Sequence, residues 1–517
     1  MTEPAPLLPS PEERLTRYGR LRDRVLRDQE WGPALRWLAP LVVTALAAVL
    51  RLIDIARPRE LAFDETYYVK DAWSLWTLGY EGTWGEDANA AFVTGQNLPL
   101  SDVGSFIVHP PLGKWLIALG MSIGGPDNSG GWRLATALLG AGSVLLVYLI
   151  ARHLSGSLVV ATVAGTLLAI DGLSIVMSRV ALLDGILTFF VLLGVLFILF
   201  DRRRTIPLLE RRDPEAPDPF WGPVLWRRPW LIAAGVALGA ASAVKWSGLY
   251  VLAGFGLYVV VTDALARRRA GVVLWPSSAA FRQGPVSFVL LVFPALAVYL
   301  ISWTGWLVTA GGYDRQSDPN PLIALWKYHE AMLGFHVGLS RGHPYASAAW
   351  EWPLLLRPTA VWVDSDPAAC GADNCIAVIS AVPNPLIWYG GVAAAVYLLY
   401  RLVRGWITRQ SIGAELSIPL VGLAVTYLPW LLFPDRTIFQ FYTVVMMPFL
   451  VLALAMTLRI IAGKRQDPLP RRLAGERTVL VFLVFVVLVS AFFLPLWMGM
   501  SVPYDFWMIH NWMPGWV

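Results

Sequence analysis

The chain has 517 residues, of which 56% are hydrophobic and only 15% charged, and its mean hydropathy is +0.56. Soluble domains carry about a quarter charged residues, so these values exclude an ordinary soluble protein and place most of the chain in lipid. The net charge of +5 does not indicate nucleic-acid binding, because the arginines gather between apolar segments, where basic residues set membrane orientation.

Apolar segments long enough to cross a membrane recur along the chain. A spanning helix needs about 20 apolar residues. By this criterion we expect an all-α polytopic membrane protein with about eleven transmembrane helices. The expected spans are 38–55, 132–151, 157–171, 183–200, 230–246, 249–263, 286–308, 385–401, 415–433, 438–460 and 478–498.

The orientation follows from the basic residues, which collect on the cytoplasmic side of membrane proteins. Residues 1–37 are polar and arginine-rich and lack the features of a signal peptide, so we expect a cytoplasmic basic tail. An odd number of spans then leaves 501–517 as an external tail. The clusters that fall on the cytoplasmic side are Arg14 to Arg36, Arg202 to Arg204, Arg211, Arg212, Arg227, Arg228, Arg267 to Arg269, Arg401, Arg404, Arg409, Lys464, Arg465, Arg471 and Arg472.

Two long loops, about 56–131 and 309–384, lie outside in this topology, and loops of this length are usually functional. In the first loop, His109-Pro110-Pro111 precedes a short apolar stretch that ends near Ile123. If that stretch crossed the membrane, every later arginine cluster would move outside. We therefore expect a helix that lies in the outer interface and begins at the two prolines.

Both cysteines, Cys370 and Cys375, fall in the second outer loop. An oxidising compartment would let them close a small disulfide loop. A metal pair is the weaker alternative, because the spacing lacks the second ligand pair of a zinc site.

Adjacent carboxylates, Asp64-Glu65, follow the first span. A carboxylate at the outer membrane surface can take a proton from an acceptor hydroxyl, which is the task of a general base. The simpler alternative is that the pair caps an interfacial helix over Thr66–Leu78. The dipeptide alone does not separate these two interpretations.

Further charges occur at the outer ends of apolar segments, and a charge at membrane depth costs roughly 2.5–3.5 kcal/mol. Each one alone can be a snorkelling side chain or a packing ion pair. Together, several cations beside two carboxylates indicate an anion site, for which a lipid phosphate is the natural occupant. Arg179 and Asp184 are five residues apart, so a pair between them would need a helix break. The charges are Arg133, Arg179, Asp184, Lys245 and Arg436.

Four histidines add titratable groups to the same face: His109, His329, His336 and His343. His329 and His336 are seven residues apart, which places them on one side of a helix. No close carboxylate or third histidine completes a recognisable metal motif. We therefore assign no metal ligand and no certain cofactor, and a divalent cation remains the weaker alternative.

This combination of charges suits sugar transfer from a polyprenyl phosphate. Phosphate is already a good leaving group, so cations that stabilise it can replace a general acid. The remaining need is a base that activates the acceptor hydroxyl, aligned opposite the leaving group. A single displacement with inversion at the anomeric carbon is expected, by analogy with inverting glycosidases.

The chain resembles the protein O-mannosyltransferase family, membrane enzymes with the GT-C glycosyltransferase fold. The resemblance covers about 40–500 and implies transfer of mannose from polyprenyl-phosphate mannose to Ser or Thr of secreted or membrane proteins, outside the bacterial plasma membrane. It rests on FDETYYVKDAWSL (63–75), VHPPLGKWLIALG (108–120), SRVALLDGIL (178–187), SAVKWSGLY (242–250) and GHPYASAAWEWPLLLRP (342–358).

The resemblance also implies roles for the candidate residues. Asp64 would be the base and Glu65 its neighbour in acceptor binding. Arg133 is the preferred phosphate ligand. The donor site would hold His109, Lys114, Arg133 and Lys245, with Arg436 added by its position, and the supporting residues would be Arg179, Asp184 and His343.

The sequence departs from the eukaryotic members in two ways. The second outer loop is too short for their soluble MIR domain, which suggests a bacterial member. Ile107 stands where many of them have an acidic residue. Any role of that acidic residue in acceptor binding would fall to Asp102 or Asp71 here.

Two other functions were weighed. A GT-C enzyme that moves a lipid-linked sugar onto a glycolipid shares the architecture and ranks second. A transporter would need charges at the bilayer midplane and internal repeats, which the sequence lacks. Association with the Sec translocon stays an alternative, since unfolded acceptors would make it convenient.

Overall fold

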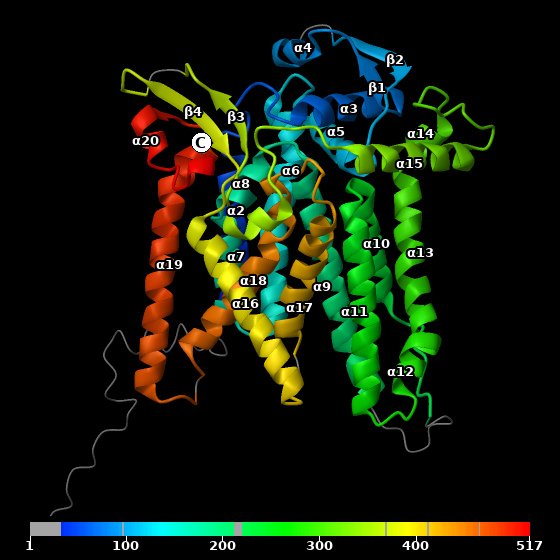
Figure 1. Cartoon of the computed structure of the whole chain (residues 1–517), viewed down its shortest axis with the longest axis vertical. Coiled ribbons are helices and arrows are strands. Elements are labelled where there is room, and N and C mark those ends of the chain that lie inside the picture. Colours follow the sequence, from blue (N-terminus) through cyan, green and yellow to red (C-terminus); the bar gives the residue numbers. More distant parts are fainter. Residues whose placement is uncertain are drawn as a thin grey trace, which may run out of the picture.

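The computed structural model describes residues 33–95, 98–210, 220–367, 370–410, 413–464 and 466–516. Long helices form a bundle, and short helices and strands form a cap at one end of it (Figure 1). Most of the expected basic tail, and the basic residues Arg211, Arg212 and Arg465, fall outside the described residues.

Each expected span contains a helix. Seven helices in the described ranges are long and apolar enough to cross a membrane, and α7 and α8, bent by 58°, make an eighth span if taken together. The multi-pass helical fold is confirmed, while the number of eleven remains a prediction because α2, α10 and α18 do not meet that measure. The bundle helices are α2 (Pro33–Leu52), α6 (Ser129–Ser155), α7 (Leu158–Ala169), α8 (Gly172–Arg179), α9 (Leu183–Glu210), α10 (Pro229–Val244), α11 (Ser247–Arg269), α12 (Trp275–Ser277), α13 (Gly284–Ser302), α16 (Pro385–Ile407), α17 (Ala414–Tyr427), α18 (Met447–Ala462) and α19 (Leu469–Trp497), while the short helix α14 (Thr304–Val308) lies in the cap (Figure 1).

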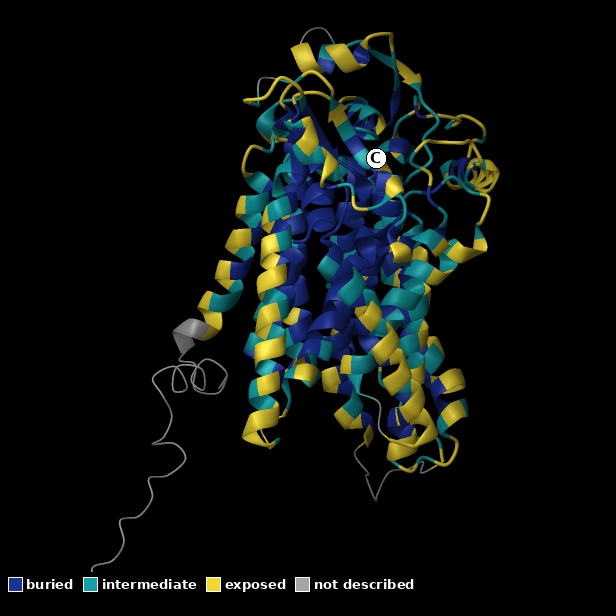
Figure 2. Ribbon diagram, turned by 60° about the vertical axis from the view of Figure 1, so that its left-hand side comes forward, coloured by how far each residue is buried: buried dark blue, intermediate teal, exposed yellow. Residues whose placement is uncertain are grey.

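Buried residues gather in the centre of the bundle and beneath the cap (Figure 2). α18 lies in this core, with almost every residue from Met447 to Met456 buried. α19 instead exposes leucine, valine and phenylalanine side chains such as Leu480, Val484 and Leu488. An apolar helix that is exposed in this way suits contact with lipid tails.

The break between α7 and α8 is held by a buried arginine from α2. Arg51 donates to the carbonyls of Leu168 and Ala169, at 3.4 and 3.2 Å, and to the hydroxyls of Ser174 and Ser178. Carbonyls at a helix end lack partners within the helix, so a cation placed there stabilises the break.

Part of the basic cluster expected to set the topology is buried instead. Arg202 and Arg228 each form ion pairs with both Asp201 and Asp263, which join α9, the start of α10 and α11. These arginines therefore fix helix packing at the end of the bundle away from the cap (Figure 1).

The cap is built from both predicted outer loops and the carboxy-terminal segment. Its described residues include five short strands that the sequence did not predict, in two antiparallel sheets ordered β1-β2 and β3-β4-β5. Because β5 pairs with β4, residues after 500 belong to the cap rather than to a separate tail. Its elements are α3 (Glu65–Leu78), β1 (Gly82–Trp84), α4 (Ala88–Thr94), β2 (Leu100–Gly104), α5 (Leu112–Gly124), α15 (Pro321–Gly338), β3 (Ala360–Asp364), β4 (Cys375–Ser380), β5 (Ser501–Pro503) and α20 (Tyr504–Met508).

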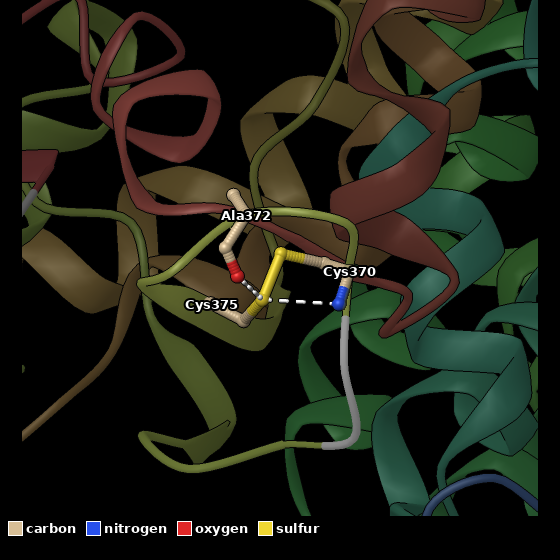
Figure 3. The surroundings of a disulfide bond; sticks show 3 residues. All are labelled: Cys370, Ala372 and Cys375. Carbon is tan, nitrogen blue, oxygen red and sulfur yellow. Dashed lines mark hydrogen bonds between the residues drawn. A yellow bond between two sulfur atoms is a disulfide. The ribbon is translucent and has the colours of Figure 1, made fainter.

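Cys370 and Cys375 form the predicted disulfide (Figure 3). The bond closes the turn that leads into β4, and the backbone N–H of Cys370 donates to the Sγ atom of Cys375 at 3.0 Å. The bridge is a local clip on the second outer loop, as the spacing indicated.

Candidate active site

The two adjacent carboxylates have opposite environments. Asp64 directly precedes α3, but its side chain does not cap the helix, so the capping interpretation is wrong. Within the described ranges its carboxylate forms no hydrogen bond or ion pair, and it lies near the charges of Lys245 and Asp184. It is therefore free to receive a proton.

Burial raises the pKa of Asp64 to about 6, while Lys245 opposes the rise and Asp184 adds to it. A general base works best when its pKa lies near the operating pH, because it is then both deprotonated and basic enough. The position of Asp64 thus gives an ordinary carboxylate the properties of a useful base.

Glu65 is fully buried and both of its oxygens are occupied. Oε1 accepts from Arg133 Nε at 2.8 Å and from the backbone N–H of Ala181 at 2.7 Å. Oε2 accepts from Arg133 Nη2 at 2.7 Å and from the backbone N–H of Ala62 at 2.8 Å. Both oxygens are used in this way, so we expect Glu65 to position the base rather than to bind the acceptor.

Arg133 is equally committed. Besides the two bonds to Glu65, it donates through Nη1 to the carbonyls of Ile55 and Pro58, and through Nη2 to the carbonyl of Glu60 at 2.9 Å. A guanidinium has five N–H donors, and these five bonds use them all. This geometry leaves Arg133 no free N–H for the phosphate of the sugar donor, so we expect it to be a buried positioning residue instead.

Arg179 is hydrogen-bonded to the backbone of the segment that precedes Asp64. Its guanidinium donates to the carbonyls of Leu50, Arg51, Ile53 and Asp54, at distances from 2.6 to 3.4 Å. Those carbonyls belong to the end of α2 and the residues just after it, so Arg179 and Arg133 hold successive parts of the segment that leads to Asp64.

Lys114 is also removed from the predicted donor site. Its ammonium group is fully buried and pairs with Glu81 at 2.5 Å, and it donates to the carbonyl of His109 at 3.1 Å. Burial raises the pKa of the neighbouring Asp71 to about 7, an effect that Lys114 reduces and Glu81 increases. Glu81 was missed because it stands alone in a loop, with no motif to mark it.

Lys245 joins the base to the cavity beside it. It ends α10 and pairs with both oxygens of Asp184 at 2.9 and 3.0 Å, and its Nζ lies 4.0 Å from the ring centroid of Tyr442. A lysine has three N–H donors, so one remains for another anion. Asp184 therefore pairs with Lys245 rather than with Arg179, and its supporting role stays a prediction.

Lys245 lines an apolar cavity of about 580 Å³ whose walls come from α10, α11, α13 and α15. Its polar lining includes His109, His329, His336 and Arg436. The prediction that His329 and His336 share one side of a helix is confirmed, since both project from α15 into this cavity. An apolar space whose lining includes Lys245 and Arg436 suits a lipid that carries a phosphate.

Arg436 and His336 form one unit at the cavity. Arg436 Nη2 donates to His336 Nδ1 at 3.0 Å, so His336 Nε2 donates to the carbonyl of Val108 at 2.8 Å. Burial and the charge of Arg436 lower the pKa of His336 to about 4, which keeps the imidazole neutral. Arg436 Nε and His109 Nδ1 are buried and have no partner in the described part of the chain.

His343 lies outside this cavity. It is exposed, and its ring contacts Phe63 at 5.9 Å and Phe439 at 5.0 Å between centroids. It therefore supports the residue that precedes Asp64.

Among the described residues, no group of three or more histidine, cysteine, aspartate or glutamate side chains could hold a metal ion. The divalent cation considered from the sequence therefore has no ligand set to propose.

Comparison with known proteins decides the family. Residues 128–310 match the family model for dolichyl-phosphate-mannose-protein mannosyltransferase, and residues 322–516 match the C-terminal four-helix membrane region of protein-O-mannosyltransferase. The polyprenol-phosphate-mannose–protein mannosyltransferase of Mycolicibacterium smegmatis strain MKD8 is 34% identical over 95% of this chain and 96% of its own length. The chain belongs to the protein O-mannosyltransferase family.

Other members agree with this assignment. The namesake enzyme of Mycobacterium tuberculosis strain H37Rv is 33% identical over 94% of both chains. The Saccharomyces cerevisiae protein O-mannosyltransferase Pmt1-Pmt2 complex bound to the sugar donor superposes with a TM-score of 0.72 at 16% identity, covering 93% of this chain and 92% of the other. That likeness shows a shared fold. The chain's family assignment makes it a membrane glycosyltransferase, and its fold is the GT-C fold, as predicted.

If Arg133 is a positioning residue, its loss should cost stability. Arg133→Ala leaves Glu65 as an uncompensated buried charge, which typically destabilises a protein by about 3–5 kcal/mol. We expect a clear fall in the thermal unfolding temperature of the purified protein, whereas Arg404→Ala, at an exposed site, should change stability by about 0.5 kcal/mol at most. An Arg133→Ala protein with unchanged stability and lost donor binding would restore the phosphate assignment.

Proposed function

We propose that this protein transfers mannose from polyprenyl-phosphate mannose to Ser or Thr hydroxyls of secreted or membrane polypeptides, with inversion. The observation that carries the proposal is the unpaired Asp64 carboxylate beside an apolar cavity whose lining includes Lys245 and Arg436. The names of the relatives, which are polyprenol-phosphate-mannose–protein mannosyltransferases, support the same donor and acceptor.

In this proposal the cavity beside Lys245 holds the donor. The polyprenyl chain lies against the apolar walls from α11 and α13, and the phosphate meets the free donor of Lys245 and the unpartnered Nε of Arg436. Both cations stabilise the phosphate as it leaves with its negative charge, so a protonated general acid is not needed. His109, which borders the same space with an unpaired nitrogen, contacts the donor headgroup.

Asp64 acts on the other reactant. It accepts the proton of the acceptor hydroxyl while the oxygen forms a bond to the anomeric carbon and the bond from that carbon to the phosphate oxygen breaks. The products are a mannosylated polypeptide and polyprenyl phosphate, and Asp64 then returns its proton to water. Glu65, held by Arg133, fixes the direction of the base without touching either substrate.

The proposal extends to the cellular setting. We place the enzyme in a bacterial plasma membrane, with its amino terminus in the cytoplasm and the cap outside. Relatives from mycobacteria and corynebacteria, and basic residues at the end of the bundle away from the cap, support this placement. Association with the Sec translocon is part of the same proposal, since acceptors must reach Asp64 unfolded.

Asp64→Asn should abolish transfer while leaving the fold and donor binding intact. Loss of a general base typically costs roughly 10²–10⁴-fold in rate. Mannose transfer to a Ser/Thr-rich peptide would be measured with purified protein in lipid, and Asp87→Asn, at an exposed aspartate of the same loop, should keep full activity. Transfer by Asp64→Asn within a few-fold of the parent would remove Asp64 from the base role.

The rate should also depend on pH through Asp64. The base works only when deprotonated, and its pKa is raised to about 6, so kcat/KM should fall about tenfold for each pH unit below that value and level off above it. Initial rates at low peptide concentration, over a pH range that brackets this value, would show the inflection. A flat profile would contradict the assignment.

Arg436→Ala should weaken donor use rather than acceptor use. A hydrogen bond to a charged group contributes about 1.5–3 kcal/mol, so the KM for the donor should rise roughly ten- to a hundredfold. His336→Gln removes the neighbouring imidazole but keeps the guanidinium, and should have a smaller effect. An unchanged donor KM in Arg436→Ala would exclude contact between Arg436 and the phosphate.

A further inference from the structure

A row of rings leads from the residue before Asp64 to a second cavity. The Phe63 ring contacts the His343 ring at 5.9 Å, and His343 contacts Tyr345 at 6.1 Å. Tyr345 lines a cavity of about 170 Å³ that is separate from the donor cavity. The transfer reaction as described above uses neither this row of rings nor the second cavity, which we call the distal cavity.

The distal cavity lies between the second outer loop and the carboxy-terminal segment. Ile376 and Val378 of β4 form one wall, and the rings of Trp507 and Trp516 form part of another. Both tryptophans present apolar surface, and aromatic surfaces of this kind bind proline and other compact apolar side chains in extended peptides.

These surfaces are held in place by hydrogen bonds. Arg357 Nε donates to the carbonyl of Pro344 at 3.0 Å, and its guanidinium lies 5.7 Å from the ring centroid of Tyr345. Arg357 Nη1 also donates to the carbonyl of Gly515 at 3.4 Å, and Trp516 Nε1 donates to the carbonyl of Leu355 at 2.7 Å. A surface that is already ordered loses little conformational freedom when a ligand binds.

The row of rings is open to solvent. His343 and Pro344 are exposed, and Tyr345 and Phe63 are partly exposed. A polypeptide that presents a hydroxyl to Asp64 can therefore contact this row of rings, which begins at the neighbouring residue Phe63.

We propose that Phe63, His343 and Tyr345 bind the acceptor polypeptide, and that the distal cavity takes a proline or similarly compact apolar side chain of that polypeptide. This inference rests on the proposed function, because it requires a polypeptide acceptor at Asp64. An extended chain advances about 3.1–3.4 Å per residue, so each ring-to-ring step corresponds to about two residues. The bound side chain then lies roughly three to five residues from the modified Ser or Thr.

The test is a set of labelled peptides with one threonine in an alanine-, glycine- and lysine-containing sequence. A single proline is moved through successive positions on both sides of the threonine. Peptide binding to the purified protein in nanodiscs is measured by fluorescence anisotropy, and mannose transfer is measured separately. We expect an optimum roughly three to five residues from the threonine on one side, with affinity and acceptor KM improved about fivefold.

Two variants then locate the effect. Tyr345→Ala removes the ring that links His343 to the cavity, and Val378→Phe fills the cavity without removing any polar contact. Both should abolish the positional optimum and leave the donor KM unchanged. Trp350→Ala, at an exposed ring of the same loop that does not line the cavity, should keep the optimum.

The outcomes separate this inference from the proposed function. Transfer to every peptide without a positional optimum, or an optimum that survives both variants, overturns the inference and leaves the function intact. A binding optimum that both variants remove, in a protein that transfers no mannose to any peptide, supports the peptide site and overturns the proposed function.

Discussion

The buried pair of Glu65 and Arg133 is the interaction on which the candidate site depends. Two charges removed from water are costly unless their geometry is good and their remaining hydrogen-bonding capacity is filled. Here the carboxylate accepts four hydrogen bonds and the guanidinium donates five. These bonds tie the segment after α2 to α6 and to Ala181, which lies just before α9. Because Asp64 is one peptide bond from Glu65, this fixed framework also sets the position of the base.

The other basic residues of the site also differ in how completely their hydrogen-bonding capacity is filled. Lys114 is neutralised by Glu81 inside the protein, and all donors of Arg133 are used, so neither can serve a ligand. Lys245 keeps one donor beyond its pair with Asp184. Arg436 contacts a neutral histidine and the Trp430 ring, and within the described residues its Nε has no hydrogen-bond partner. The sequence predicted five basic residues for the site, namely Lys114, Arg133, Arg179, Lys245 and Arg436. Of these, only Lys245 and Arg436 have an unused N–H donor and also line the cavity. The charged residues in the sequence therefore locate the site. The hydrogen bonds in the structure then show which of these residues hold the fold together and which have donors left for a ligand.

This difference explains how far the sequence could be used. The helical spans, the interfacial helices and the shared face of His329 and His336 follow from local periodicity, and the short cysteine spacing suggested the disulfide. The ion pairs do not, because Arg133 and Glu65 are 68 residues apart and Lys245 and Asp184 are 61 apart. The spacing of Arg179 and Asp184 suggested that any pair would need a helix break, and a break is present, but each side chain found its partner elsewhere. The strands of the cap were missed because they are only three to six residues long, and because β5 pairs with a strand far away in the sequence.

In the segment from Ala62 to Glu65, consecutive side chains face different parts of the protein. Phe63 has a positive φ of 50°, a conformation that costs energy in a residue with a large side chain. The carboxylate of Glu65 accepts the N–H of Ala62, and the backbone N–H of Glu65 donates to the carbonyl of Ala62. The turn that contains this strained residue is therefore closed by two hydrogen bonds between Ala62 and Glu65. As a result, consecutive side chains point to different surroundings: Glu65 into the protein, Asp64 towards Lys245, and Phe63 towards His343. In the proposed mechanism the strain therefore has a use, since it separates the framework, the base and the acceptor track within three residues.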